Sequence, residues 1–99
     1  MIIRIFRAKI RTDKVSEFKQ MVIDQSIPWL ESSDGMLGYF PGEPFNDHER
    51  EFVMITLWRD QEALEAFAGT AWDNPVITED EAPLVEAMFA DHYLRFDKQ

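Results

Sequence analysis

The stretch FVMITLWRDQEALEAFAGTAW, residues 52–72, decides the fold because it contains a strand, a turn and a helix in succession. Residues 51–58 are β-formers with apolar side chains at both parities, which predicts a strand that must be covered on both faces. Asp60 is placed to cap a helix that stops at Gly69. The inward positions of that helix are Ala63, Leu64, Phe67 and Ala68.

The residues before this stretch predict a strand, a helix and a second strand. Residues 2–11 alternate with the period of a half-buried strand, and Arg4 alone breaks the apolar parity. Apolar residues at helical spacing follow to about Gln25, with Thr12 or Asp13 as the cap, and Pro28 should end or kink this helix. The turn SSDG then leads into a strand, MLGYF, which Pro41 interrupts.

The residues after this stretch predict a last strand over 88–96. One parity carries Met88, Ala90, His92, Leu94 and Phe96. Between the two regions we expect a small acidic helix within 79–87, because Thr78 and Glu81 have the spacing of a capping box.

This order of elements, β-α-β-β-α-β, predicts an α+β fold of the ferredoxin-like type, with a four-stranded antiparallel sheet and both helices on one face. The other face then needs a cover, since Ile3 and Ile5 add to its apolar surface. We expect the same face of a second chain to supply it, which makes a dimeric α+β barrel with residues such as Met54 in the interface.

Composition points to one domain, residues 1–99, that associates with a second copy. A chain of 99 residues has a thin core, and without cysteine it has no disulfide to strengthen it. A net charge of −9 makes nucleic acids and anionic membranes poor partners. No apolar run approaches the roughly 20 residues of a membrane span, so we expect a cytoplasmic protein.

Charge is distributed unevenly along the chain. Residues 4–19 hold six of the ten cations, whereas residues 73–91 carry six acids and neither Lys nor Arg. Two interpretations remain open: a solvated acidic face, or pairing between the basic first strand and the acidic last third.

Four segments together resemble the antibiotic biosynthesis monooxygenase domain family, of the dimeric α+β barrel superfamily. They are RIFRAKIRTDKVSEFKQMV near the start, DGMLGY before the second strand, FVMITLWRDQEALEAFAG in the middle and DHYLRF near the end. The resemblance implies a homodimer with a cleft in each subunit between the sheet and the helix at 61–69. It also implies oxygenation of phenolic or quinol-type substrates without metal or flavin.

Such chemistry depends on the substrate itself. A deprotonated, electron-rich aromatic can give an electron to dioxygen, so the protein must supply a base, an apolar slot and donors for the developing negative oxygen. No sequence-contiguous metal motif occurs, and the two histidines, His48 and His92, are far apart in the chain. We therefore expect no cofactor and no metal.

A haem-degrading branch of the superfamily uses an Asn on the first strand with a Trp and a His near the second helix. Here the first strand has Phe6 and Arg7 at that point, and Phe67 stands where the Trp would be. No His occurs between His48 and His92. We therefore set haem degradation aside.

The candidate catalytic residues are His92, Trp72 and Arg7. His92 has interior parity and is either a base or a core histidine tied to a backbone carbonyl. Trp72 is either packing or one wall of a cleft, whereas Trp58 is interpreted as a core or interface anchor. Arg7, like Arg4, needs a carboxylate or a ligand anion, and Asp91 is one candidate partner.

The candidate substrate-binding residues are Tyr39, Phe67 and Tyr93, and His48 in the loop FNDHER is expected to be solvated. The hydroxyls of Tyr39 and Tyr93 could orient a phenolic substrate, or both residues could simply be half-buried in the sheet.

Three functions remain open. The first is a cofactor-independent monooxygenase acting on a small aromatic, quinol or polyketide-like compound. The second is a non-catalytic or stress-related dimeric module whose cleft holds a small apolar ligand or is filled by side chains, and the third is an isomerase or lyase with His92 as base. A cleft of roughly 300 Å³ or more near Trp72 and His92 would favour a substrate site.

Overall fold

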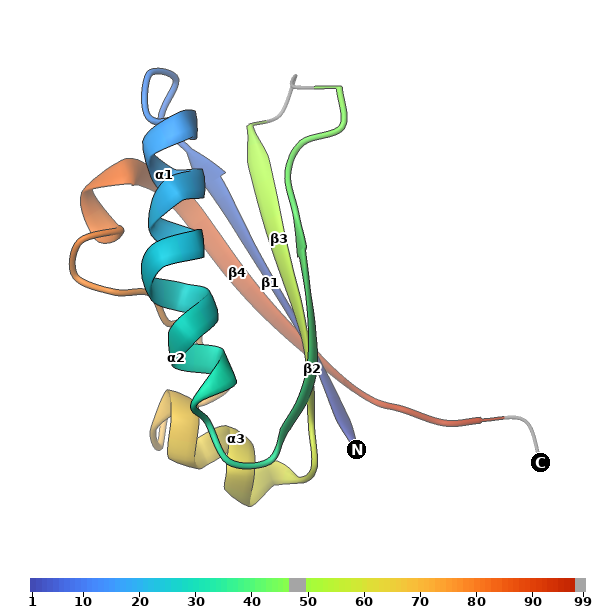
Figure 1. Ribbon diagram of the computed structural model, residues 1–99. Coiled ribbons are helices and arrows are strands. Elements are labelled where there is room, and N and C mark those ends of the chain that lie inside the picture. The colour runs from blue at the N-terminus through green and yellow to red at the C-terminus, as the bar shows by residue number, and fades with distance from the viewer. Residues whose placement is uncertain (47–49, 98–99) are drawn as a thin grey trace.

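The computed structural model describes residues 1–46 and 50–97, so the prediction for His48 lies outside the described residues. Its four strands are β1 (Ile2–Ile10), β2 (Met36–Gly42), β3 (Glu51–Trp58) and β4 (Val85–Leu94). They form one antiparallel sheet in the order β2-β3-β1-β4 (Figure 1). This is the predicted α+β, ferredoxin-like arrangement.

A bent helical segment connects β1 to β2. It consists of α1 (Val15–Met21), a π-helical turn η1 (Val22–Ser26) and α2 (Ile27–Glu31). The helical segment therefore continues past Gln25, its predicted approximate end, as far as Glu31. Pro28 lies in the first turn of α2, where a residue without an N–H is tolerated, and the π turn next to it absorbs the change of hydrogen-bond register.

The N-terminus of α1 also differs from the prediction. Lys14 occupies the capping position and no side chain caps the helix, so neither Thr12 nor Asp13 does so. The cap of α3 (Gln61–Ala68) is as predicted, because the Asp60 carboxylate accepts from the Ala63 N–H at 2.9 Å. Gly69 ends α3 with φ 86°, a conformation that favours glycine.

The segment before β4 contains one 3₁₀ turn, η2 (Ala82–Leu84), in place of the predicted acidic helix over 79–87. The Thr78 Oγ accepts from the Glu81 N–H, but the Glu81 carboxylate accepts from Ser26, so the predicted capping box is half formed. Strand β4 begins at Val85, three residues before the predicted Met88.

The helices lie on one side of the sheet, and no described element covers the other side (Figure 1). Register places Phe6, Met54 and Ala90 on the helix side. Ile5, Ile55 and Asp91 are therefore on the uncovered side, which we call the open face. Met54 was thus predicted for the wrong face, and its neighbour Ile55 lies on the open one.

The core consists of two clusters under the helices. One contains Ala8, Ile10, Phe18, Phe52 and Leu84, and the other contains Leu30, Trp58, Ala63 and Leu64. Trp58 is fully buried and donates from its indole N–H to the Thr56 hydroxyl at 2.9 Å, so its interpretation as a core anchor is confirmed. None of the helices in the described ranges is long and apolar enough to cross a membrane.

Candidate functional site

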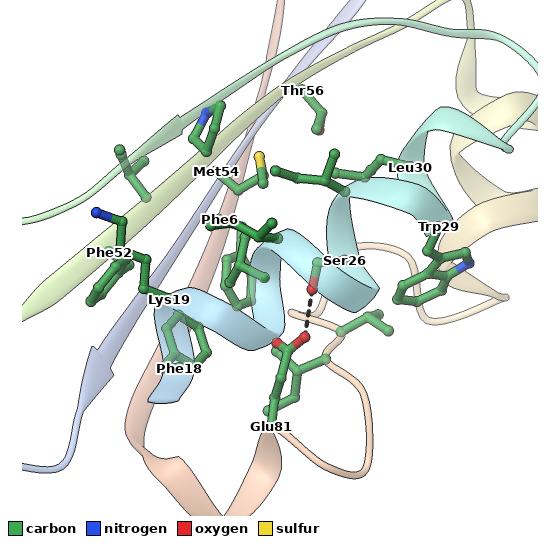
Figure 2. Close-up of a pocket in the computed structure, with 18 of the residues that line it drawn as sticks. Phe6, Phe18, Lys19, Ser26, Trp29, Leu30, Phe52, Met54, Thr56 and Glu81 are labelled. Carbon is green, nitrogen blue, oxygen red and sulfur yellow. Dashed lines mark hydrogen bonds between the residues drawn. The ribbon is translucent and has the colours of Figure 1, made fainter. Parts of the chain in front are cut away.

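A cavity of about 260 Å³ lies between the helix-covered face of the sheet and the helical segment α1-η1-α2 (Figure 2). Its wall includes Phe18 and Phe52 from one core cluster and Leu30 from the other. The cavity therefore occupies the space between the two clusters. The resemblance implied a cleft between the sheet and the second helix, α3; in the structure α3 contributes Phe67 to the wall, and most of the helical lining comes from α1-η1-α2.

Most of the wall is apolar. Aromatic rings come from Phe6, Phe18, Trp29, Phe52 and Phe67. Aliphatic groups come from Val22, Ile23, Ile27, Leu30, Pro41, Met54, Val76 and Ile77. Such a lining favours a small apolar or aromatic molecule, with orientation left to the few polar groups.

The polar wall residues are an exposed pair, a buried set and the partly buried Ser26. Lys19 and Glu43 are both exposed and form an ion pair at 3.0 Å between α1 and the end of β2, which marks the mouth of the cavity. Arg4, Thr56 and Glu81 are each almost completely buried. The buried set therefore supplies the polar chemistry inside.

Arg4 is the buried cation of the cavity. Its Nη1 donates to the carbonyl of Trp72 and to His92 Nε2, the latter at 2.8 Å, and its Nη2 donates to the carbonyl of Asn74 at 3.0 Å. No carboxylate of the described residues forms an ion pair with it. Burial lowers the pKa of Arg4 from its ordinary value, but a guanidinium keeps its charge at neutral pH.

His92 and Trp72 come together beside Arg4, behind the cavity wall. Their rings meet edge to face with centroids 5.1 Å apart. A guanidinium has only donors, so His92 Nε2 accepts from Arg4 and the imidazole is neutral with its proton on Nδ1. Burial and the charge of Arg4 lower the pKa of His92, against smaller opposing effects of Asp73 and Asp91.

This geometry bears directly on the two interpretations of His92. Its partner is the Arg4 side chain and not a backbone carbonyl, and the lone pair that a base would use is already engaged. Neither His92 nor Trp72 lines the cavity. The cavity is therefore bordered by Arg4 and not by these two residues, beside which the cleft was predicted.

Glu81 is the buried acid of the cavity, and sequence reasoning missed it as a site residue. It is 2 % exposed, and its Oε1 accepts from the Ser26 hydroxyl of η1 at 2.5 Å, the contact drawn in Figure 2. The two residues are 55 positions apart, so only the folded chain brings them together. The local sequence signal was the capping-box spacing of Thr78 and Glu81, which indicated a turn rather than a buried acid.

The remaining predicted site residues are dispersed. Phe67 lines the cavity, where its ring stacks against Trp29 and Trp58 at 4.2 and 4.9 Å. Tyr39 donates to Glu31 at 2.8 Å, a contact that raises the Tyr39 pKa, and it does not line the cavity.

Arg7 and Tyr93 lie on the open face, away from the cavity. Arg7 pairs with Asp91 at 3.0 Å, which was the predicted alternative to an anion site, and its guanidinium lies 5.2 Å from the centre of the Phe89 ring. Tyr93 stands opposite Ile3 in the register and is exposed. Within the described ranges, no group of three or more His, Cys, Asp or Glu side chains is placed to hold a metal ion.

A one-sided antiparallel sheet with an apolar cavity beneath its helices defines the class of the fold as α+β, with space for a small molecule. Residues 1–98 match the family model described as antibiotic biosynthesis monooxygenase, and the chain belongs to this family. The class is thus that of monooxygenases, at the level of the family. No protein of curated function matches the chain significantly.

Solved structures share the fold at low sequence identity. A Nitrosomonas europaea protein assigned to the antibiotic biosynthesis monooxygenases has TM-score 0.77 at 19 % identity, over 98 % of this chain and 100 % of its own. PA3566 from Pseudomonas aeruginosa has TM-score 0.76 at 18 % identity, over 97 % and 94 %. A MhuD variant with two manganese protoporphyrin IX groups bound per active site has TM-score 0.74 at 18 % identity, over 100 % and 98 %.

Proposed function

We propose that this protein is a cofactor-independent monooxygenase that acts on a small aromatic, quinol or polyketide-like compound bound in the cavity. The observation that carries the proposal is the buried Arg4 guanidinium in an otherwise largely apolar cavity wall. An electron-rich aromatic fits the rings of that wall, and an oxygen that becomes negative during reaction finds a fixed cation.

The reaction balances without a further reductant. The substrate loses two hydrogen atoms and gains one oxygen atom of dioxygen, as when a ring CH₂ becomes a carbonyl or a quinol becomes a hydroxyquinone. The other oxygen atom leaves as water with those two hydrogens, so the substrate supplies all the electrons. The protein binds and orients the ring, excludes water and stabilises the substrate anion through Arg4. Trp72, through its carbonyl, and His92, through its ring nitrogen, hold Arg4 in position.

The same proposal includes a homodimer. The open face carries Ile3, Ile5, Val53, Ile55, Leu57, Phe40 and Phe89, a continuous apolar surface that one chain leaves uncovered. Pairing two such faces makes the dimeric barrel, with Arg7, Asp91 and Tyr93 as interface residues rather than catalytic ones.

Oxygen uptake tests the activity. With a panel of naphthalene and anthracene quinols, we expect enzyme-dependent consumption of O₂ and, from ¹⁸O₂, one labelled atom in the product. Product formation without O₂ consumption would favour an isomerase or lyase. Binding without any turnover across the panel would favour the ligand-binding module.

A further inference from the structure

Glu81 is placed like a recognition group rather than a structural ion. Its side chain is 2 % exposed and forms part of the cavity wall. No Lys, Arg or His of the described residues forms an ion pair with it, and Ser26 is the donor to its Oε1. A carboxylate in such surroundings normally requires further donors.

The second oxygen of this carboxylate is the one open to a ligand. Within residues 1–46 and 50–97, Glu81 Oε2 accepts no hydrogen bond. No polar side-chain atom of these residues is both fully enclosed and without a partner. Oε2 therefore retains some accessible surface, and the wall that Glu81 forms faces the cavity. A donor inside the cavity would complete its hydrogen bonding.

Arg4, in the same cavity wall, has unused hydrogen-bond donors where Glu81 has an unused acceptor. Its three hydrogen bonds use Nη1 twice and Nη2 once, so the Nε–H and one Nη2–H have no acceptor in the described part of the chain. The Nε atom, which has no acceptor among the described residues, is likewise not fully enclosed. An acceptor inside the cavity would complete this side.

Arg4 and Glu81 do not form an ion pair with each other, although they share one cavity of about 260 Å³. Two opposite charges in the wall of one largely apolar cavity fit a ligand that contacts both. The cavity volume suits one or two fused rings.

We propose that Arg4 and Glu81 form a two-ended recognition site, and that the substrate is a planar hydroxy-carbonyl aromatic. Its carbonyl or phenolate oxygen accepts from Arg4 and its hydroxyl donates to Glu81. The substrate class rests on the proposed monooxygenase function, whereas the two-ended binding does not. The site discriminates against dicarboxylates, which Glu81 repels, and against plain hydrocarbons, which leave both groups unpaired.

Binding of compounds that do not react with oxygen tests this inference separately from turnover. The probes are 4-hydroxyacetophenone, acetophenone, 4-ethylphenol and ethylbenzene, together with the analogous set built on 6-hydroxy-2-acetonaphthone, which covers a longer span. Affinity is read from quenching of tryptophan fluorescence, since Trp29 lines the cavity. We expect the hydroxy-ketone of one set to bind about tenfold or more tightly than either one-group parent.

Two variants assign the ends. Glu81→Gln should weaken the hydroxyl-bearing probes about tenfold and leave acetophenone unchanged, and Arg4→Lys should do the reverse. Glu79→Gln is the matched control, because it removes the same charge two residues away on an exposed side chain outside the cavity wall.

The result that overturns the inference is equal affinity for the hydroxy-ketone and its one-group parents in the unmodified protein, at both ring sizes. Equal loss across all four probes in Glu81→Gln would also overturn it. The first comparison needs no variant, so a variant that fails to fold leaves the inference testable. Absence of oxygen uptake would count against the proposed function and not against these affinities.

Discussion

Arg4 and Arg7 lie three residues apart on β1, and they meet opposite environments. Arg4 is 3 % exposed, lines the cavity and is held by two carbonyls and an imidazole. The Arg7 side chain is 38 % exposed and pairs with the half-exposed Asp91 at 3.0 Å. Because successive side chains of a strand alternate between faces, an odd spacing is enough to separate them.

The difference shows that the sheet has one face over a cavity and one uncovered face; in the proposed function the first serves chemistry and the second association. A buried cation is shielded from water. If it also has no carboxylate partner among the described residues, it still attracts an anion in the cavity. An exposed cation that is already paired with a carboxylate attracts a further anion only weakly. The same residue type is therefore held by carbonyls and an imidazole on one face and by a carboxylate on the other, and we propose a ligand-binding role only for the first.

The largest expected effect is a difference in unfolding free energy between two single variants that carry the same substitution, one at Arg4 and the other at Arg7. Arg4→Met should cost about 3 kcal/mol of unfolding free energy or more, because the carbonyls of Trp72 and Asn74 and the nitrogen of His92 lose their donor. Arg7→Met should cost under about 1 kcal/mol, as expected for an exposed pair. Urea unfolding monitored by circular dichroism measures both.

Equal costs for the two variants would contradict the assignment of the faces. Asp91→Asn serves as a control, since it removes the partner of Arg7 without touching the strand that carries Arg4.

The next effect concerns the open face. Ile55→Asp should weaken association about a hundredfold or more, because an unpaired charge would be buried between two chains. Sedimentation equilibrium against concentration is the measurement, with Ser32→Asp on an exposed turn as the control. A parent protein that stays monomeric near 11.6 kDa at micromolar concentration would remove the barrel model altogether.

A smaller effect is expected at Ser26. Ser26→Ala removes the hydrogen bond to Glu81, and a bond to a charged acceptor contributes about 1.5–3 kcal/mol. Ser32→Ala is the matched control, because its hydroxyl donates to a backbone carbonyl at the exposed end of α2. Thermal unfolding of the two variants should rank Ser26→Ala as the less stable, and the opposite ranking would show that Glu81 is satisfied without Ser26.

The smallest effect is the pH dependence that His92 confers. Burial and the charge of Arg4 lower its pKa in the folded state below the ordinary value of 6.5, so the unfolded chain takes up the proton first as pH falls. Its contribution to stability is therefore complete above about pH 6.5 and declines below it. In His92→Gln, the difference in unfolding free energy between pH 7.5 and pH 5.5 should be smaller than in the unmodified protein. An unchanged difference would show that the carboxylates, and not His92, cause it.

Much of the fold was predictable because it follows local periodicity. Alternation of apolar residues located β1, a run of β-formers located β3, and the Asp60 cap with Gly69 located α3. The π turn and the 3₁₀ turn were not predictable, since both depend on how α1-η1-α2 packs against the sheet rather than on local pattern.

The candidate site was less predictable for the same reason. In the sequence, Arg4 is recognisable as the one charged residue among apolar residues of the same strand parity. Its partners Trp72, Asn74 and His92, however, are about 70 or more residues away. Nothing local distinguishes Glu81 from the other acids of residues 73–91, because its burial depends on Ser26.

The most direct test of the two-faced account is a crystal structure of the protein with 6-hydroxy-2-acetonaphthone. We predict the ring system in the cavity under α1-η1-α2, with the carbonyl oxygen on Arg4 and the hydroxyl on Glu81, and the open face in contact with a second copy. A ligand seated on the open face beside Arg7, with the cavity filled by side chains, would contradict it.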